Sequence, residues 1–300
     1  MNIIVTGGAG FLGSHLVQSL IDKNYFPIIV DNLTTGNYTY IKKFIDSGKA
    51  KFIKSDIRNL KKLPSATVVI HLGAIASISE SIKNPTYVND VNVNGTLNML
   101  EFCRVQKIKK FIFISSAAVF GENEKKLSES SITTPSTVYG VTKLVGENYC
   151  RIYSNLFGIK CIVFRPFNIF GKRQNAEYAA VIPKFLSRLK DNKSPIIYGN
   201  GTQTRDFIHV SDVVQAIILA LKYNKSNFEI FNLGTGKSLS INHLFKIFQS
   251  LSSHQIRAIY KKGPSGVPKS STSIYKIKKL LKFTPKKAIT DGIFELLSEN

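Results

Sequence analysis

Four closely spaced glycines near the start of the chain could hold a phosphate. The segment MNIIVTGGAGFLGSHLV places Gly7, Gly8, Gly10 and Gly13 between an apolar run and a stretch with helical spacing. Glycine tolerates positive φ and lets a ligand approach the backbone closely. A helix that starts near Phe11 points its free N–H groups and the positive end of its dipole at that ligand. We therefore predict that this turn binds a pyrophosphate.

An acidic residue follows at the distance that a dinucleotide site needs. The apolar run FPIIVDN ends in Asp31, about 20 residues after the glycines. An acid there accepts hydrogen bonds from the adenosine ribose and repels a 2′-phosphate, which favours NAD over NADP. The alternative is that the glycines only form a tight turn and Asp31 only caps the next element. The order of strand, turn, helix, strand and acid favours the dinucleotide site.

A tyrosine and a lysine four residues apart could form a catalytic base. Tyr139 and Lys143 lie in TVYGVTKLVGENY, whose helical periodicity puts both side chains on one face. A phenol has a pKa near 10, so it acts as a base near neutral pH only beside positive charge, from Lys143 and an oxidised nicotinamide. The pair alone is also consistent with an ordinary amphipathic helix. A strand that ends in Ser115 and Ser116 can add a hydroxyl beside the phenol, which favours the catalytic interpretation.

These residues need a scaffold that brings several strand ends together. Apolar runs at 2–7, 27–32, 51–56, 67–72, 109–116 and 160–166 alternate with segments of helical period. Such alternation predicts an α/β fold with a doubly wound parallel sheet of the Rossmann type. Ligands bind at the carboxyl ends of the strands in such sheets, so we expect the residues after each run to gather at one edge.

The sequence also predicts how the chain is divided. The regular alternation ends near Gly171, and a clear helical pattern returns in SDVVQAIILALKY. We predict an NAD-binding domain over residues 1–170, to which residues 205–235 return. Residues 171–204 and 236–300 are then expected to form a smaller, discontinuous substrate-binding domain.

Composition limits the class of protein. The chain has 300 residues, 43% of them hydrophobic, which is enough for a full core. Its longest apolar runs are far shorter than a membrane span, and no signal-peptide pattern precedes the first strand. Three cysteines without metal-ligand spacing indicate neither a disulfide framework nor a metal site. We therefore expect a soluble cytoplasmic protein without a metal.

The net charge of +22 could instead indicate a nucleic-acid ligand. However, only eight of the 41 basic residues are arginine, the residue that forks onto phosphates. The lysines are spread along the chain. We interpret the charge as a solvated, lysine-rich surface that helps to attract an anionic substrate.

Taken together, these motifs resemble those of the extended short-chain dehydrogenases/reductases, in the branch of NAD-dependent nucleotide-sugar epimerases and dehydratases. The resemblance covers nearly the whole chain and is carried by TGGAGFLG, DNLTTG, SDIRN, HLGAIAS, NVNGTLNMLE, SSAAVFG, YGVTK, FRPFNIFG, RDFIHVSDV and FNLGTG. It implies contacts to the cofactor from Gly7, Gly10, Phe11, Leu12 and Gly13 at the pyrophosphate, Asp31 and Asn32 at the adenosine ribose, Asp56 and Ile57 at the adenine, Leu72, Gly73 and Ala74 along its middle, and Tyr139 and Lys143 at the nicotinamide ribose.

The same resemblance implies a set of substrate contacts. Ser116 and Tyr139 would contact the reacting hydroxyl, and Asn168 the diphosphate or the sugar. Arg205 would face the diphosphate, where electrostatics favours a cation. We expect Asn92 and His209 to be structural and leave them out of the catalytic set, because an asparagine inside a helix more often binds nearby backbone.

Two alanines limit which reactions of this family the chain is expected to catalyse. Ala117 and Ala118 stand where dehydrating members usually have an Asp-Glu pair and decarboxylating members a glutamate. The chain looks most like the UDP-hexose 4-epimerase group, acting on UDP-glucose and UDP-galactose or their N-acetylated forms. The resemblance implies that Tyr139 takes the proton of the sugar 4-hydroxyl while hydride leaves C4 for NAD. Hydride then returns to the other face of the 4-keto sugar, and the cofactor stays bound.

Alternatives remain open at this point. A nucleotide-sugar 4-ketoreductase would use the same residues but release oxidised cofactor after one transfer. A remote alternative is an inactive nucleic-acid-binding protein on this fold. The segment YKKGPSGVP departs from the Arg-Pro-Gly-Asp usual in the epimerase group, so Lys261 or Lys262 is a candidate for a second diphosphate cation. Helices around 92–103 and 139–150 form dimer interfaces in many relatives, which implies a homodimer.

Overall fold

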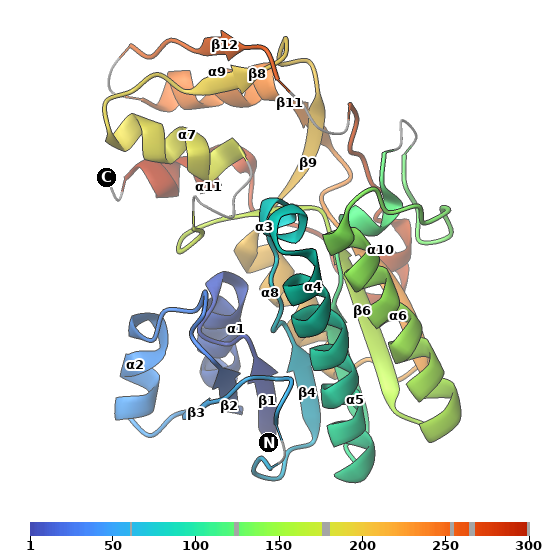
Figure 1. Ribbon diagram of the computed structural model, residues 1–300. Coiled ribbons are helices and arrows are strands. Elements are labelled where there is room, and N and C mark those ends of the chain that lie inside the picture. Colours follow the sequence, from blue (N-terminus) through green and yellow to red (C-terminus); the bar gives the residue numbers. More distant parts are fainter. Residues whose placement is uncertain (61, 123–125, 176–180, 253–254, 264–267, 299–300) are drawn as a thin grey trace.

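The six apolar runs of the first 170 residues are strands of one parallel sheet, which a seventh strand from later in the chain completes (Figure 1). The computed structural model describes residues 1–60, 62–122, 126–175, 181–252, 255–263 and 268–298. In spatial order the strands are β10 (Phe228–Leu233), β6 (Lys160–Pro166), β5 (Lys110–Ile114), β4 (Val68–His71), β1 (Asn2–Thr6), β2 (Phe26–Asp31) and β3 (Lys51–Lys54). The order reverses between β1 and β4, and ligands bind in the crevice at such a reversal.

Helices cover both faces of this sheet. One face packs against α1 (Phe11–Asp22), α2 (Thr39–Asp46), α8 (Val210–Leu221) and α10 (Tyr275–Leu281). The other packs against α4 (Pro85–Asn89), the π-helical turn η1 (Asp90–Asn94), α5 (Gly95–Val105) and α6 (Val138–Phe157), with α3 (Ile78–Lys83) beside them. The predicted doubly wound Rossmann fold is confirmed.

The two-sided burial explains why the strands are continuous apolar runs. Successive side chains of a strand point to opposite faces. In β1, Ile3 and Val5 lie in the core on the α1 side, whereas Ile4 lies in the core on the α5 side. All three are fully buried. Strands buried in this way are therefore mostly apolar at consecutive positions.

A smaller part of the molecule lies beyond the carboxyl ends of the strands, at the top of Figure 1. It contains a three-stranded sheet of β11 (Ser238–Ser240), β9 (Thr204–His209) and β7 (Asn168–Phe170), and the pair β8 (Ile196–Tyr198) and β12 (Ile259–Lys261). Its helices are α7 (Val181–Lys190), α9 (Ile241–Leu251) and α11 (Ile289–Leu297). Its core includes Phe185 and Phe248, whose rings meet edge to face with centroids 5.6 Å apart.

The chain crosses between the two parts more than once. β10 pairs with β6 in the large sheet, and α8 packs on α1. In contrast, β9 pairs with β7 and β11 outside that sheet, and α10 returns to pack on β10 and α8. The division into an NAD-binding domain of 1–170 with 205–235 and a substrate domain of 171–204 with 236–300 stays a prediction.

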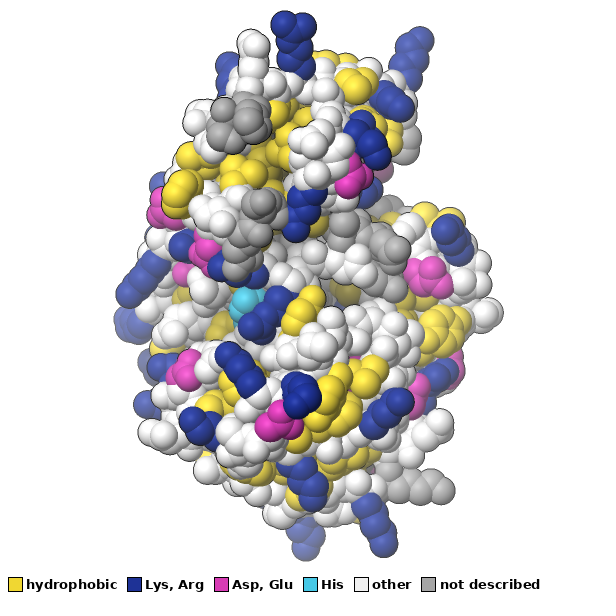
Figure 2. All heavy atoms as spheres, turned by 90° about the vertical axis from the view of Figure 1, so that its left-hand side faces the viewer, with side chains coloured by type: hydrophobic (Ala, Val, Ile, Leu, Met, Phe, Trp, Pro, Cys, Tyr) yellow, Lys and Arg dark blue, Asp and Glu magenta, His cyan; other side chains and the backbone are white. Residues whose placement is uncertain are grey.

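The surface is basic without one dominant patch on the face in Figure 2, where Lys and Arg side chains are scattered over the whole view. None of the helices in the described part of the chain combines the length and the apolar character that crossing a bilayer needs.

Candidate active site

The glycine turn between β1 and α1 is packed backbone against backbone. Gly7 has a φ of +67°, and a Cβ there would lie 2.8 Å from the amide nitrogen of Gly73. A Cβ on Gly13 would lie 2.1 Å from the carbonyl oxygen of Gly7. No side chain of the described residues caps α1, whose N-cap is Gly10. The first N–H groups of α1 are thus open to an anion at the turn.

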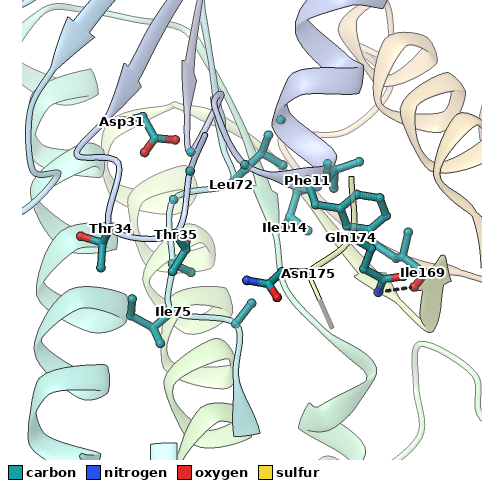
Figure 3. Close-up of a pocket in the computed structure, with 18 of the residues that line it drawn as sticks. Phe11, Asp31, Thr34, Thr35, Leu72, Ile75, Ile114, Ile169, Gln174 and Asn175 are labelled. Carbon is teal, nitrogen blue, oxygen red and sulfur yellow. Dashed lines mark hydrogen bonds between the residues drawn. The ribbon is translucent and has the colours of Figure 1, made fainter. Parts of the chain in front are cut away.

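A cavity of about 1020 Å³ opens at this turn, at the carboxyl ends of the strands. In Figure 3, Asp31, Thr34 and Thr35 lie on one side of it, and Phe11, Ile169 and Gln174 on the other. Fifteen of the residues singled out from the sequence line it: Gly7, Gly10, Phe11, Leu12, Gly13, Asp31, Asn32, Ile57, Leu72, Gly73, Ala74, Ser116, Tyr139, Lys143 and Asn168.

Asp31, at the end of β2, is held in one orientation. Its Oδ2 accepts the N–H of Ala9 at 3.0 Å, and its Oδ1 accepts the N–H of Leu33 at 2.8 Å. Burial raises the pKa of Asp31, and these two backbone bonds act against the rise. A carboxylate oxygen has two lone pairs. Each oxygen of Asp31 therefore keeps one for a ribose hydroxyl.

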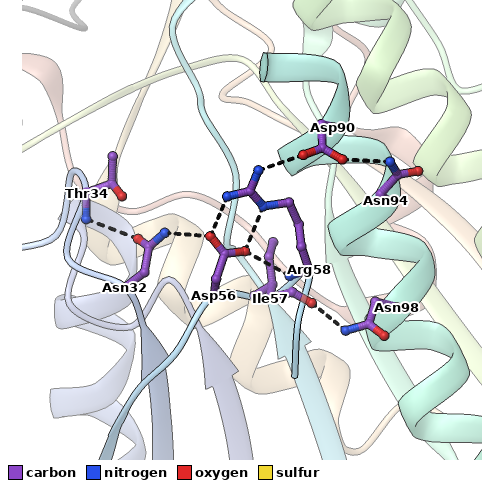
Figure 4. Close-up of polar contacts among 8 residues, drawn as sticks. All are labelled: Asn32, Thr34, Asp56, Ile57, Arg58, Asp90, Asn94 and Asn98. Atoms are coloured by element: carbon purple, nitrogen blue, oxygen red, sulfur yellow. Dashed lines mark hydrogen bonds and ion pairs between the residues drawn. The ribbon is translucent and has the colours of Figure 1, made fainter. Parts of the chain in front are cut away.

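Asp56 does not itself line the cavity but fixes the wall beside it (Figure 4). Arg58 forks onto its carboxylate, with Nε 2.9 Å from Oδ1 and Nη2 2.8 Å from Oδ2. Arg58 also reaches Oδ2 of Asp90 at 2.6 Å, and Asn32 donates to Oδ2 of Asp56 at 3.1 Å. The network ties the segment that carries Ile57 to η1.

Removing Arg58 should flatten the acid-induced loss of stability. The Arg58 guanidinium lowers the pKa of Asp56 from 3.8 to about 2. A depressed folded pKa gives stability that is present above pH 4 and is lost as the pH falls toward 2. In Arg58→Met the part of this contribution that comes from the guanidinium disappears, whereas the backbone N–H of residue 58 and Asn32 still donate to Asp56. The free energy of unfolding, measured by urea melts, should therefore fall less steeply across that window. The exposed Lys23→Met is the control, and an equally steep fall in both variants would contradict the assignment.

The segment Leu72–Ala74 is fixed by a buried polar chain. The N–H of Gly73 donates to Oγ1 of Thr6 at 3.1 Å, and that oxygen lies 2.7 Å from Nδ1 of His71. Nε2 of His71 contacts Oγ1 of Thr96 at 3.1 Å. Burial lowers the pKa of His71 to about 3, so its imidazole is neutral. This series of hydrogen bonds holds the glycine turn and the end of β4 together.

Tyr139, Lys143 and Ser116 meet at the end of β5. Nζ of Lys143 lies 5.9 Å from the centre of the Tyr139 ring and donates to the carbonyl of Ile114 at 2.9 Å. Burial raises the pKa of Tyr139 to about 12, and a hydrogen bond with Ser116 acts in the opposite direction. Burial lowers the pKa of Lys143 to about 8. The phenol therefore has a hydroxyl in contact and an ammonium on its own helix face.

Asn92 and His209 make the contacts expected of structural residues. Oδ1 of Asn92, in the π-helical turn, accepts the N–H of Ile75 at 2.8 Å, and its Nδ2 donates to the carbonyl of Ile75 at 3.1 Å. His209 is the N-cap of α8, where Nδ1 accepts the N–H of Ser211. Both side chains thus make hydrogen bonds to backbone groups.

The substrate residues predicted from the sequence are not all at the cavity. Asn168 lines it and donates from Nδ2 to the carbonyl of Asp206 at 3.0 Å. Arg205, on β9, is half-buried, donates from Nη1 to the carbonyl of Thr204 at 2.8 Å, and is not among the described lining residues. Lys261 in β12 and the adjacent Lys262 are exposed and are not among them either.

Apart from Asn168, sequence reasoning missed the polar residues that line the cavity from the smaller part. Arg173, Gln174 and Lys190 do so. Arg173 has a φ of +66°, and its guanidinium lies 5.3 Å from the centre of the Tyr40 ring. Its Nη1 is buried without a hydrogen-bond partner among the described residues. Only the two cations in GKRQN, the segment directly after FRPFNIFG, could have indicated that this part of the chain lines the cavity.

The fold and these side chains define a Rossmann-type dinucleotide-binding protein whose cavity is also lined by Ser116, Tyr139 and Lys143. The chain belongs to the NAD dependent epimerase/dehydratase family, whose model matches residues 3–234. NAD is thus its cofactor, as predicted. The residues present fit it, because the turn leaves no room for a Cβ at Gly7 or Gly13 and Asp31 keeps acceptors for a ribose.

Several of the similar proteins are named as UDP-sugar 4-epimerases. A putative UDP-glucose 4-epimerase of Methanocaldococcus jannaschii is 43% identical over 272 residues, covering 88% of this chain and 87% of its own. The structure of UDP-glucose 4-epimerase from Thermotoga maritima with UDP-glucose matches with a TM-score of 0.93 and 33% identity over 99% of this chain and 98% of that one. UDP-glucuronic acid 4-epimerase from Bacillus cereus, with UDP-glucuronic acid and NAD, matches with a TM-score of 0.91 and 30% identity over the whole of both chains.

Proposed function

We propose that the chain catalyses NAD-dependent epimerisation at C4 of a UDP-linked hexose, namely UDP-glucose and UDP-galactose or their N-acetylated forms. The observation that carries this is the end of β5, where Ser116 contacts the Tyr139 phenol and is followed by Ala117 and Ala118 instead of an acid pair. Positions 117 and 118, directly after Ser116, carry no carboxylate for dehydration. The similarity to three UDP-sugar 4-epimerases supports the same reaction.

We assign the residues to roles along the cavity. The glycine turn with Phe11 and Leu12 binds the pyrophosphate, and Asp31 with Asn32 binds the adenosine ribose. The remaining assignments are Asp56 and Ile57 at the adenine, Leu72, Gly73 and Ala74 along the middle of the cofactor, Tyr139 and Lys143 at the nicotinamide ribose, Ser116 and Tyr139 at the reacting hydroxyl, Asn168 at the diphosphate or sugar, and Arg205 at the diphosphate.

In the reaction, Tyr139 takes the proton of the 4-hydroxyl and later returns it. Lys143 stabilises the phenolate, because a nearby positive charge favours the ionised form. Ser116 bridges the phenol and the sugar oxygen and holds both at hydrogen-bond distance. Bound NAD supplies the acceptor and donor for the hydrogen at C4. The 4-keto sugar presents its other face before the proton returns.

We also propose a homodimer that works in the cytoplasm and has no nucleic-acid ligand. Apolar side chains of α6, including Val141 and Leu156, are 45% and 69% exposed, which supports a partner on that face. The three cysteines are buried free thiols, as suits a reducing compartment. The scattered lysines of Figure 2 support a solvated surface.

Purified protein without added cofactor should interconvert a pair of UDP-sugars. UDP-glucose, UDP-galactose, their N-acetylated forms and UDP-glucuronic acid are incubated separately and the products are separated by chromatography. We expect one C4 pair to equilibrate, because the cofactor is regenerated in each cycle. Turnover only of a 4-keto sugar with added reduced cofactor would instead establish the ketoreductase. No conversion by folded, NAD-loaded protein would contradict the UDP-hexose assignment.

A further inference from the structure

A buried ion pair lies directly behind the catalytic side chains. Glu147 is on α6, one helical turn after Lys143, and Arg165 is on β6. Their side chains are only 3% and 5% exposed. Arg165 forks onto the carboxylate, with Nε 2.9 Å from Oε1 and Nη2 2.6 Å from Oε2.

Stability alone does not account for this pair. The cost of desolvating two charges offsets most of their attraction, so well-packed apolar residues are often as stable. The guanidinium also lies 4.8 Å from the centre of the Phe120 ring, and Nη1 donates to the carbonyl of Glu129 at 3.3 Å. Arg165 is therefore locked in place and holds the Glu147 carboxylate in a single orientation.

The carboxylate reaches the strand end that carries the catalytic contacts. Oγ of Ser115 donates to Oε1 of Glu147 at 2.5 Å. Ser115 stands between Ile114, whose carbonyl accepts the Lys143 ammonium at 2.9 Å, and Ser116, which contacts Tyr139. Residues 114–116 thus contact both catalytic side chains, and Glu147 accepts a hydrogen bond from the middle residue, Ser115.

We propose that Glu147, oriented by Arg165, is a positioning residue that aligns residues 114–116 and sets a fixed negative charge beside Lys143. This rests on the proposed function, in which Lys143 must stay protonated to stabilise the Tyr139 phenolate. Glu147 itself touches neither substrate nor cofactor and acts through Ser115 and Lys143.

The charge of Glu147 has a definite effect on pH dependence. The titratable and charged groups around Lys143 in the described chain are Tyr139, Glu147 and Cys150 on α6, His71 on β4, and Arg165 on β6 behind Glu147. Burial lowers the pKa of Lys143 to about 8, whereas Cys150 and Glu147 raise it. His71 is neutral, so it adds no charge. Without the Glu147 charge the pKa of Lys143 falls further.

Three variants separate alignment from charge. Glu147→Gln keeps the shape and an acceptor for Ser115 but removes the charge. Glu147→Gln with Arg165→Gln also removes the unpaired buried cation that could unfold the single variant. Ser115→Ala breaks the contact to the strand end and keeps the charge. Glu101→Gln, a carboxylate change on α5, is the matched control.

The first readout is the pH profile of kcat. Activity is lost as the pH rises through the pKa of Lys143, so Glu147→Gln should show that loss about one pH unit lower than the wild type. The double variant should show a smaller shift in the same direction, because the more distant positive charge of Arg165 is removed as well. Ser115→Ala should lower kcat several-fold with KM and the profile unchanged. Glu101→Gln should behave as the wild type. A folded Gln variant with an unshifted profile, or Ser115→Ala with the wild-type kcat, overturns the proposal.

The second readout does not need turnover. Competitive labelling with acetic anhydride, analysed peptide by peptide by mass spectrometry, measures the pKa of Lys143 against the exposed Lys23 as internal reference. Glu147→Gln should lower the pKa of Lys143 by about one unit and the double variant by less, because Arg165 is removed too. An unchanged value in both variants overturns the proposal. Wild-type protein that converts no sugar contradicts the proposed function, whereas this labelling result still decides the role of Glu147.

Discussion

A Tyr139→Phe variant is expected to lose about 10²–10⁴-fold in kcat while it still purifies with bound NAD. A positioned general base contributes about that factor, and phenylalanine removes only the hydroxyl that carries the proton. The ring stays between Ser116 and Lys143, so the fold and the cofactor site change little. Initial rates by chromatography and the NAD content released on denaturation measure the two quantities separately.

The control for this variant is Tyr149→Phe, a change of the same kind ten residues further along α6. Tyr149 packs at the edge of the core and does not line the cavity in the described chain. Its variant should keep the wild-type kcat. A Tyr139→Phe enzyme that turns over within a few-fold of the wild type would show that another group takes the proton.

The second large effect is expected from Gly13→Ala. The new Cβ would lie 2.1 Å from the carbonyl oxygen of Gly7 and 2.6 Å from the Cα of Gly8. Both are backbone atoms of a tight turn, so α1 must shift. Overpacking costs about 1–3 kcal/mol of stability, and the displaced N–H groups no longer point at the pyrophosphate. We expect a lower melting temperature and at least about a tenfold weaker affinity for NAD, which corresponds to about 1.4 kcal/mol.

Calorimetry with NAD added to protein from which the copurified NAD has been removed, together with thermal melts, tests this variant. Ser19→Ala, in the same helix and away from the turn, is the matched control, because alanine is the best helix former and adds no atoms there. It should bind NAD as the wild type does. Gly13→Ala protein with unchanged affinity for NAD would mean that the turn is not the pyrophosphate site.

The sequence predicted the large sheet well because its strands are buried on both faces. The runs around Ile4, Val69 and Ile112 are apolar at each position, and each is a strand of the sheet. The common position of Tyr139 and Lys143 could also be predicted from the sequence, because helical spacing fixes their common face and the α6 helix extends over both. Patterns that repeat with the period of the backbone are visible without coordinates.

The smaller part was harder to predict for a physical reason. Its cavity wall is made by Arg173 and Lys190, long side chains whose position depends on tertiary contacts such as the Tyr40 ring. No periodicity encodes such a contact. A motif can also predict a contact that the structure does not show. The motif around Arg205 predicts a diphosphate contact, whereas the described cavity is lined by other cations. The roles of these residues stay predictions for experiment.

The place of β10 in the sheet has a consequence for how the chain is made. β10 covers the edge of β6 but is synthesised about 60 residues later. At about 5–20 residues per second the ribosome leaves that edge without its neighbour for about 3–12 s. During this interval the hydrogen-bonding groups on the outer side of β6 are open to strands of other nascent chains. Resistance to aggregation thus depends on how soon β10 pairs with β6 after synthesis, and not only on the stability of the finished sheet.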